Sequence, residues 1–287
     1  MFESVTRGWG MVKASWGVLK DYPKLAVFPV FSGIALLGVT AVMVIPTGVG
    51  AALGVGMNLS DNEIQGIVYA ALFVWYFLCT FVVVFCNAAL ISCALQSFAG
   101  QPPTIGSGFA AAAKRLPQIL GWSLLAATVG VILQAVESLL TEKLGFFGDL
   151  LSGIFSALWG VATYFAIPVV VTEGVGPIRA IKRSSALLRR TWGESLAGAG
   201  GLGLISTLFA LPLIGIVALI TVLAGGVGGQ AAAWTLGPIA AVYLLALILV
   251  FTALGAIFRA AVYVYATTGA TPSHMDSRLL QSSFRPK

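Results

Sequence analysis

The sequence predicts an all-α integral membrane protein with six transmembrane helices, and its composition and its long apolar runs carry that prediction. Its residues are 59% hydrophobic and only 9% charged, with a mean hydropathy of +0.98, far more apolar than an average soluble domain. Uncharged runs such as 25–57 and 237–258 exceed the ~20 apolar residues that cross a hydrocarbon core of about 30 Å. The first run is also too long for a secretory signal.

Six spans are expected, at about 25–56, 65–98, 118–140, 147–172, 195–225 and 236–268. Several are longer than the core is thick, so they must tilt, break or project into water. Prolines mark the candidate break points, because proline removes a backbone donor and clashes with the preceding turn; they are Pro29, Pro46, Pro168, Pro212 and Pro238. Most such prolines are accommodated by neighbouring helices, although broken helices also line cavities.

The cations are distributed unequally between the connections. Every Lys and Arg except Lys143 lies in the N-terminal segment, in the second or fourth connection, or on the C-terminal side from Arg259 onward, whereas the acidic residues divide evenly between the two sides. Connections rich in cations stay in the cytoplasm, so both termini are expected there, with the chain in the cytoplasmic (inner) membrane. The pI of about 9.4 then reports topology, and no nucleic-acid partner is expected.

The most basic stretch is 176–195, GPIRAIKRSSALLRRTWGES, between the fourth and fifth spans. Gly174 and Gly176 end the preceding span, and Pro177 suits a first helical turn. On a helical wheel the cations share one arc and the apolar residues, with Trp192, occupy the rest; the cations are Arg179, Lys182, Arg183, Arg189 and Arg190. Such a helix is typical of a membrane interface. Two interpretations stand, a topological anchor for the fifth span and a platform for anionic lipid or a protein partner.

The same pattern recurs near the N-terminus. Residues 7–17, RGWGMVKASWG, align without gaps on 183–193, RSSALLRRTWG, so that Arg7, Lys13 and Trp16 match Arg183, Arg189 and Trp192. Residues 111–122, AAAKRLPQILGW, form a looser third copy. Three tandem repeats are therefore predicted, each a basic interfacial helix on the cytoplasmic side followed by two spans. Their limits are about 1–104, 105–176 and 177–272, within a single transmembrane domain, 1–272, that precedes a short basic tail, 273–287.

One segment also carries a family resemblance. Residues 167–194, IPVVVTEGVGPIRAIKRSSALLRRTWGE, together with GWGMVKASWGVLK and FPV nearer the N-terminus, resemble an uncharacterised prokaryotic family of six-span membrane proteins, a domain of unknown function. The A-x-K-R-S helix is distantly similar to the membrane domain of some glycerophosphoryl diester phosphodiesterases, whose catalytic barrel has no counterpart here. The resemblance implies fold and location, and no site residues.

Groups that carry chemistry are scarce in this sequence. The only histidine, His274, lies in the tail, and no Ser–His–acid set or phosphate-binding glycine motif is present. Cys79, Cys86 and Cys93 are seven residues apart, a rise of about 10.5 Å between neighbours, whereas zinc ligands lie ~2.3 Å from their ion. We therefore expect no enzymatic activity, no cofactor and no metal site, and we interpret the cysteines as packing residues.

Arg259 is the leading polar residue of the spans. With a sixth span at 237–256 it lies at the cytoplasmic edge, and with a span at 249–268 it lies near mid-bilayer and needs a partner. In the repeat alignment it falls opposite Asn87 and Tyr164, which suggests a shared polar lining.

Two main functional hypotheses follow. The first is a non-enzymatic membrane protein whose basic amphipathic helices bind anionic lipid headgroups or a partner protein, which includes a second copy of the chain. The residues expected to bind are Arg179, Lys182, Arg183, Arg189, Arg190, Trp192, Arg7, Lys13 and Trp16. The alternative is a transporter or channel for a small or lipidic solute, with its lining near Asn87, Tyr164 and Arg259. A membrane enzyme acting on lipids ranks third.

Overall fold

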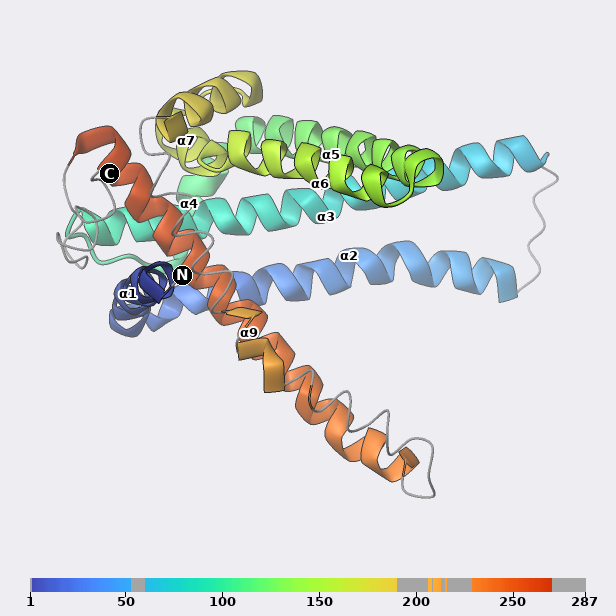
Figure 1. Ribbon diagram of the computed structural model, residues 1–287, viewed down its shortest axis with the longest axis horizontal. Helices are drawn as coiled ribbons and strands as arrows, with labels where there is room; N and C mark the ends of the chain where they lie inside the picture. Colours follow the sequence, from blue (N-terminus) through green and yellow to red (C-terminus); the bar gives the residue numbers. More distant parts are fainter. Residues whose placement is uncertain are drawn as a thin grey trace. The chain divides into compact units, whose positions relative to one another are not determined.

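The computed structural model describes residues 2–52, 60–189, 206–207, 209–212, 215 and 229–269, and every regular element in them is helical (Figure 1). The helices are α1 (Phe2–Asp21), the short 3-10 helix η1 (Pro23–Ala26), α2 (Val27–Ala52), α3 (Asp61–Phe98), α4 (Ile105–Ala113), α5 (Leu116–Leu144), α6 (Phe146–Thr163), α7 (Ala166–Glu173), residues 177–189 and α9 (Gly229–Thr268). The all-α prediction is confirmed for these residues.

Five helical stretches are long and apolar enough to cross a membrane: Pro23–Met43, Asn62–Phe98, Leu116–Leu144, Phe146–Glu173 and Gly237–Thr268. They coincide with five of the predicted spans, and the protein is a multipass membrane protein. The remaining predicted span, 195–225, lies largely outside the described residues, so the number six stays a prediction. Large apolar side chains such as Leu37 and Val42 are 73% and 68% exposed, as expected for helices that face lipid rather than water.

One of the predicted proline break points does interrupt a helix in the described part of the chain. The stretch 146–173 is divided at Tyr164–Phe165 into α6 and α7, four and three residues before Pro168, because proline has no N–H for the carbonyl four residues earlier and clashes with it. Pro46 and Pro238 instead lie inside continuous helices, and Pro29 lies in the first turn of α2. Pro212 is described only within the short helical piece 209–212.

Helices precede three of the predicted spans, at the places where the repeat predicts basic helices: α1, α4 and residues 177–189. The looser copy differs in conformation, because α4 ends at Ala113 and Lys114–Arg115 form a turn, whereas Lys182–Arg183 lie inside a helix. Pro117 explains the turn, since it removes one helical hydrogen bond and crowds the carbonyl of Ala113. The tandem repeat and its limits stay predictions.

The chain forms two compact units. We call the first the terminal unit; it contains Met1–Val27, Ala94–Pro103 and the chain from Arg190 onward. The second, the central unit, contains Phe28–Cys93 and Thr104–Arg189.

The core of the central unit is an aromatic cluster around α4. The Phe109 ring lies 5.1 Å from that of Phe28 and 5.9 Å from that of Phe85, centre to centre. The N-terminus of α4 is closed by a capping box, in which Thr104 and Ser107 each accept the other's backbone N–H at 3.0 Å. Cys93 Sγ donates to the carbonyl of Thr104 at 3.3 Å, so this buried thiol helps to position α4 on α3.

Helices α5 and α6 form an antiparallel hairpin in the central unit. Gly145 makes the connection with φ +53°, a conformation that glycine adopts without steric cost. The Trp122 and Trp159 rings are stacked, 6.3 Å apart and nearly parallel at 4°, which holds the two helices together at their other end.

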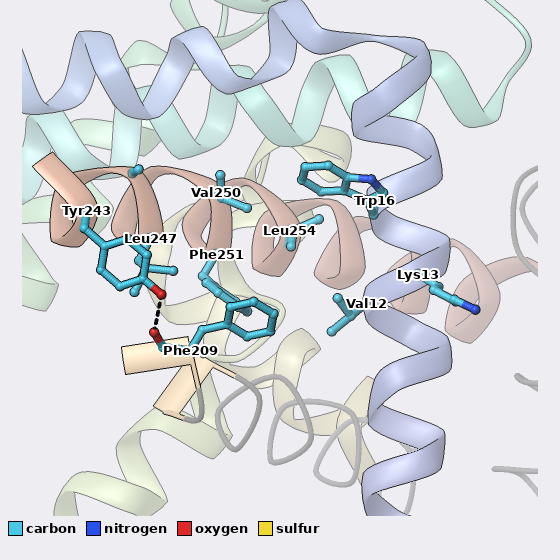
Figure 2. Close-up of a pocket in the computed structure, with 10 residues that line it drawn as sticks. Val12, Lys13, Trp16, Phe209, Tyr243, Leu247, Val250, Phe251 and Leu254 are labelled. Atoms are coloured by element: carbon cyan, nitrogen blue, oxygen red, sulfur yellow. Dashed lines mark hydrogen bonds between the residues drawn. The ribbon is translucent and has the colours of Figure 1, made fainter. Parts of the chain in front are cut away.

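In the terminal unit, α1 packs against α9 and η1. Figure 2 shows α1 crossing α9, with Val12 and Trp16 near Leu254. The buried residues of α1 recur at helical spacing, Val12, Ser15, Val18 and Leu19, so α1 turns one face toward the protein. The second half of α9 is buried from Ala253 to Tyr263 apart from Gly255 and Arg259, while its first half exposes Ile239, Val242, Leu245 and Ile248.

Candidate functional site

The candidate site is centred on the basic helical residues 177–189 of the central unit. Their buried side chains recur three or four residues apart, at Ala180, Ser184, Leu187 and Leu188. The cations lie on the exposed part of the helix: Arg179, Lys182, Arg183 and Arg189. We call these four residues the basic surface. The predicted members Arg190 and Trp192 lie outside the described residues.

The buried face of this helix closes the break between α6 and α7. Ser184 Oγ accepts the backbone N–H of Phe165 at 2.9 Å, and both residues are fully buried. Ser185 Oγ donates to the carbonyl of Ala162 at 3.4 Å. A broken helix at membrane depth must satisfy its freed backbone groups inside the protein, and these two serines do so. The basic helix is therefore a structural part of the fourth span.

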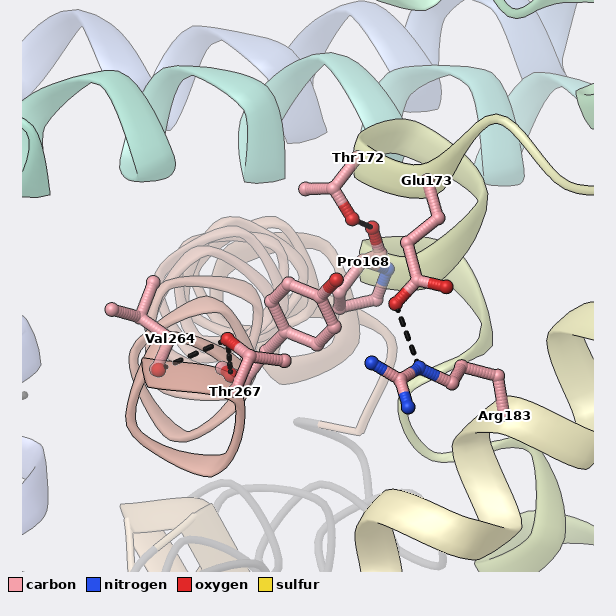
Figure 3. Close-up of polar contacts among 7 residues, drawn as sticks. Pro168, Thr172, Glu173, Arg183, Val264 and Thr267 are labelled. Atoms are coloured by element: carbon pink, nitrogen blue, oxygen red, sulfur yellow. Dashed lines mark hydrogen bonds and ion pairs between the residues drawn. The ribbon is translucent and has the colours of Figure 1, made fainter. Parts of the chain in front are cut away.

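An ion pair joins the middle of the basic helix to the end of α7. Arg183 Nε donates to Glu173 Oε1 at 2.9 Å, with the two side chains 45% and 30% exposed, and Figure 3 shows the pair beside the Thr172–Pro168 hydrogen bond. An ion pair this accessible to solvent contributes little to stability. Its main effect is on charge, since it offsets one cation of the basic surface.

The C-terminus of α7 is closed by side chains from the start of α5. Arg115 Nε donates to the carbonyl of Val171 at 3.2 Å, and its Nη2 donates to that of Thr172 at 3.5 Å. Gln118 Nε2 donates to the carbonyl of Gly174 at 3.3 Å. These carbonyls have no partner within their own helix, and a guanidinium also offsets the negative end of the helix dipole.

Gly174 makes this closure possible. Its φ is +64°, the left-handed conformation that ends many helices. A Cβ built at this position would lie 2.3 Å from Arg115 Nη1, so a side chain would displace the guanidinium. The sequence pattern predicted that Gly174 ends the span and that Pro177 begins a helix, and both are confirmed.

Sequence reasoning missed the roles of Arg115 and Gln118. It treated Arg115 as one more cation of a cytoplasmic connection, whereas the side chain is directed to backbone carbonyls. The only signal in the sequence was a cation two residues before Pro117, and nothing there indicates a partner more than fifty positions away.

The N-terminal members of the predicted site lie on α1 in the terminal unit. Lys13 is exposed and Trp16 is 48% exposed. Arg7 belongs to α1, but its side chain lies outside the described part of the structure. Lys13 and Trp16 thus lie on the accessible side of a helix whose other face is buried.

The predicted polar lining involves both units. Asn87 lies on α3 and Tyr164 at the break after α6, both in the central unit, whereas Arg259 lies on α9 in the terminal unit. Arg259 is half-buried, and its Nε donates to the carbonyl of Gly255 at 3.2 Å. A shared lining of these three residues stays a prediction, as does the depth of Arg259 in the membrane.

A comparison with protein-family models identifies the family of this chain. Residues 66–273 match DUF6159, a family of unknown function. The chain belongs to the DUF6159 family. The DUF6159 match covers more than half of the chain and includes Arg115, Gly174 and the basic surface, while α1 lies before it. The distant similarity to the phosphodiesterase membrane domain gains no support from this comparison, and a search of curated proteins finds no match.

Proposed function

We propose that this protein is a non-enzymatic, multipass protein of the cytoplasmic membrane whose basic surface binds the headgroups of anionic lipids. The observation that carries the proposal is the division of residues 177–189 into a buried face, which closes the break in the fourth span, and an exposed face with four cations. A helix attached to the end of a span in this way holds its charges at a constant depth relative to the bilayer.

The chemistry of the exposed face suits a membrane interface. Each cation close to an anionic leaflet adds about 1 kcal/mol of attraction. Ile178 is 65% exposed beside Arg179, and an apolar side chain among cations enters the boundary between headgroups and acyl chains. The polar groups behind the surface already have structural bonds, Ser184 to Phe165 and Arg115 to α7, which favours a binding role over a catalytic one.

The test compares two triple variants in nanodiscs that contain phosphatidylglycerol and phosphatidylethanolamine with the same acyl chains. The first is Arg179→Gln, Lys182→Gln, Arg189→Gln, which leaves the Arg183–Glu173 pair intact. The control is Lys20→Gln, Lys24→Gln, Lys114→Gln, which removes the same charge from exposed residues elsewhere. Native mass spectrometry counts the phosphatidylglycerol molecules that each protein retains at low and high salt.

We expect the first variant to retain several-fold less phosphatidylglycerol than the control and wild type. The difference should shrink at high salt, because the screening length falls from about 10 Å at 0.1 M to about 3 Å at 1 M. Equal retention by the two variants would refute lipid binding by this surface. Release of a co-purifying protein subunit by the first variant alone would instead identify an acidic protein partner.

A further inference from the structure

The terminal unit contains an apolar groove to which no residue of the basic surface contributes. It has a volume of about 490 Å³, within the range of small-molecule sites. Helix α1 and helix α9 provide most of its walls, with Phe209 on a third side (Figure 2). The lining residues are Val12, Lys13, Trp16, Phe209, Tyr243, Ala246, Leu247, Val250, Phe251 and Leu254.

The groove is long and follows the membrane span. Its residues on α9 extend from Tyr243 to Leu254, which is about 16 Å at 1.5 Å per residue. The hydrocarbon core is about 30 Å thick, so the groove is about as long as one leaflet is deep. A second cavity of about 400 Å³ shares Leu247 and Phe251 with the groove, and Ser206 and Thr252 also line it.

The two ends of the groove differ in polarity. At one end, Tyr243 Oη donates to the carbonyl of Phe209 at 2.7 Å, so this hydroxyl already has an acceptor. At the other end lie Trp16 and Lys13, whose side chain extends away from the apolar residues of α9 (Figure 2). An ammonium beside an apolar channel matches a molecule with an anionic head and a hydrocarbon tail.

We propose that this groove holds one acyl chain of an anionic phospholipid, with the headgroup beside Lys13 and Trp16. An apolar cavity left empty forfeits the dispersion contacts of its walls, and inside a bilayer the molecules that compete to fill it are lipid tails rather than water. The walls therefore accept any acyl chain, and Lys13 selects the headgroup. The inference rests on the proposed function in one respect, that the cytoplasmic leaflet supplies the anionic lipid.

The test separates the groove from the basic surface by filling it. Leu247→Trp places an indole in the channel, and Val250→Phe is a milder version in case the first variant folds poorly. The matched control is Leu245→Trp, on the same helix at a side chain that is 54% exposed and lines neither cavity. Each protein is taken through the same nanodiscs, and native mass spectrometry after mild activation counts the most firmly held lipid.

Wild type and Leu245→Trp should each retain one phospholipid after the loosely held lipids are lost, and the groove-filled variants should lose it. Lys13→Gln should lower the preference for phosphatidylglycerol over phosphatidylethanolamine by about fivefold, because one cation near an anionic headgroup contributes about 1 kcal/mol of attraction. Lys20→Gln should leave this preference unchanged. Retention by Leu247→Trp and Val250→Phe equal to the control would overturn the proposal.

Failure of the groove and failure of the proposed function give different patterns. If the groove-filled variants retain lipid while the Arg179/Lys182/Arg189 variant loses it, the acyl site is wrong and the basic surface stands. If the firmly held lipid is lost only when the groove is filled, and the Arg179/Lys182/Arg189 variant retains as much lipid as its control, the acyl site is supported and lipid binding by the basic surface is refuted.

Discussion

Arg115 Nε donates a hydrogen bond to the carbonyl of Val171 at 3.2 Å, across 56 positions of sequence. The bond joins the first turn of α5 to the last turn of α7, next to the helix that carries the basic surface. A cation that the sequence pattern placed among the surface charges is therefore structural.

Replacing Arg115 should destabilise the protein. Arg115→Gln removes the guanidinium from two carbonyls at the end of α7, and lost hydrogen bonds to a charged group cost about 1.5–3 kcal/mol. Unfolding in detergent, followed by tryptophan fluorescence, measures the change. Lys114→Gln removes an exposed neighbouring cation and should change stability by less than ~0.5 kcal/mol. Similar losses from the two variants would contradict the closure of α7 by Arg115.

A side chain at Gly174 should be costly for two reasons. Gly174→Ala forces a left-handed residue and places a Cβ 2.3 Å from Arg115 Nη1, so we expect a loss of about 1–3 kcal/mol. The control is Gly176→Ala, where a Cβ meets nothing within 4 Å. Combining Gly174→Ala with Arg115→Ala should cost less than the sum of the single changes, because the steric contact is then absent. Strict additivity would show that the two residues do not interact.

Gly108 should be required for the packing of α4. A Cβ there would lie 2.5 Å from Cys93 Sγ and 2.7 Å from Phe28 Cζ, and overpacking a core costs about 1–3 kcal/mol. Gly108→Ala should therefore lower the thermal midpoint in detergent. Gly106→Ala, on the same helix with nothing within 4 Å, should leave it nearly unchanged. An unchanged midpoint for Gly108→Ala would mean that α4 does not lie this close to α3.

Removing Glu173 should strengthen lipid binding with little effect on stability. The Arg183–Glu173 pair is 45% and 30% exposed, so Glu173→Gln should change the free energy of unfolding by less than ~1 kcal/mol. It also removes a carboxylate that repels anionic headgroups, so phosphatidylglycerol retention should rise. Glu142→Gln makes the same change at an exposed residue on the predicted outer side and should have no such effect. Equal changes in phosphatidylglycerol retention for Glu173→Gln and Glu142→Gln would show that Glu173 does not influence lipid binding at the basic surface.

The orientation of the chain is testable with a membrane-impermeant maleimide in a cysteine-free background. Gln101→Cys, at an exposed residue in the connection between α3 and α4, should react only after the cytoplasmic membrane is opened, because the basic side is expected inside. Phe146→Cys, at the start of α6 and 76% exposed, should react in intact spheroplasts. The opposite pattern would invert the predicted topology and move the basic surface to the outer leaflet.

Local sequence patterns were sufficient to predict much of the fold. Apolar runs predicted four of the candidate spans, and the start of the first one, to within a few residues. Gly174 and Pro177 predicted where one helix ends and the next begins. These features are local, because a span is recognised by its own length and hydropathy and a cap by its own backbone preference. Pro168 was one of five equivalent prolines in the sequence, and only the packing around each proline decided which helix breaks.

The sequence by itself determined that this chain belongs in a membrane, since so many long runs without charge are stable as helices only where lipid replaces water. It also determined which segments concentrate the cations. The tertiary structure decided which polar groups are hydrogen-bonded inside the protein. Ser184 Oγ accepts the N–H of Phe165, and Arg115 Nε donates to the carbonyl of Val171. Those bonds join residues 19 and 56 positions apart, and a helical period describes neighbours three or four positions apart, so no local pattern contains them.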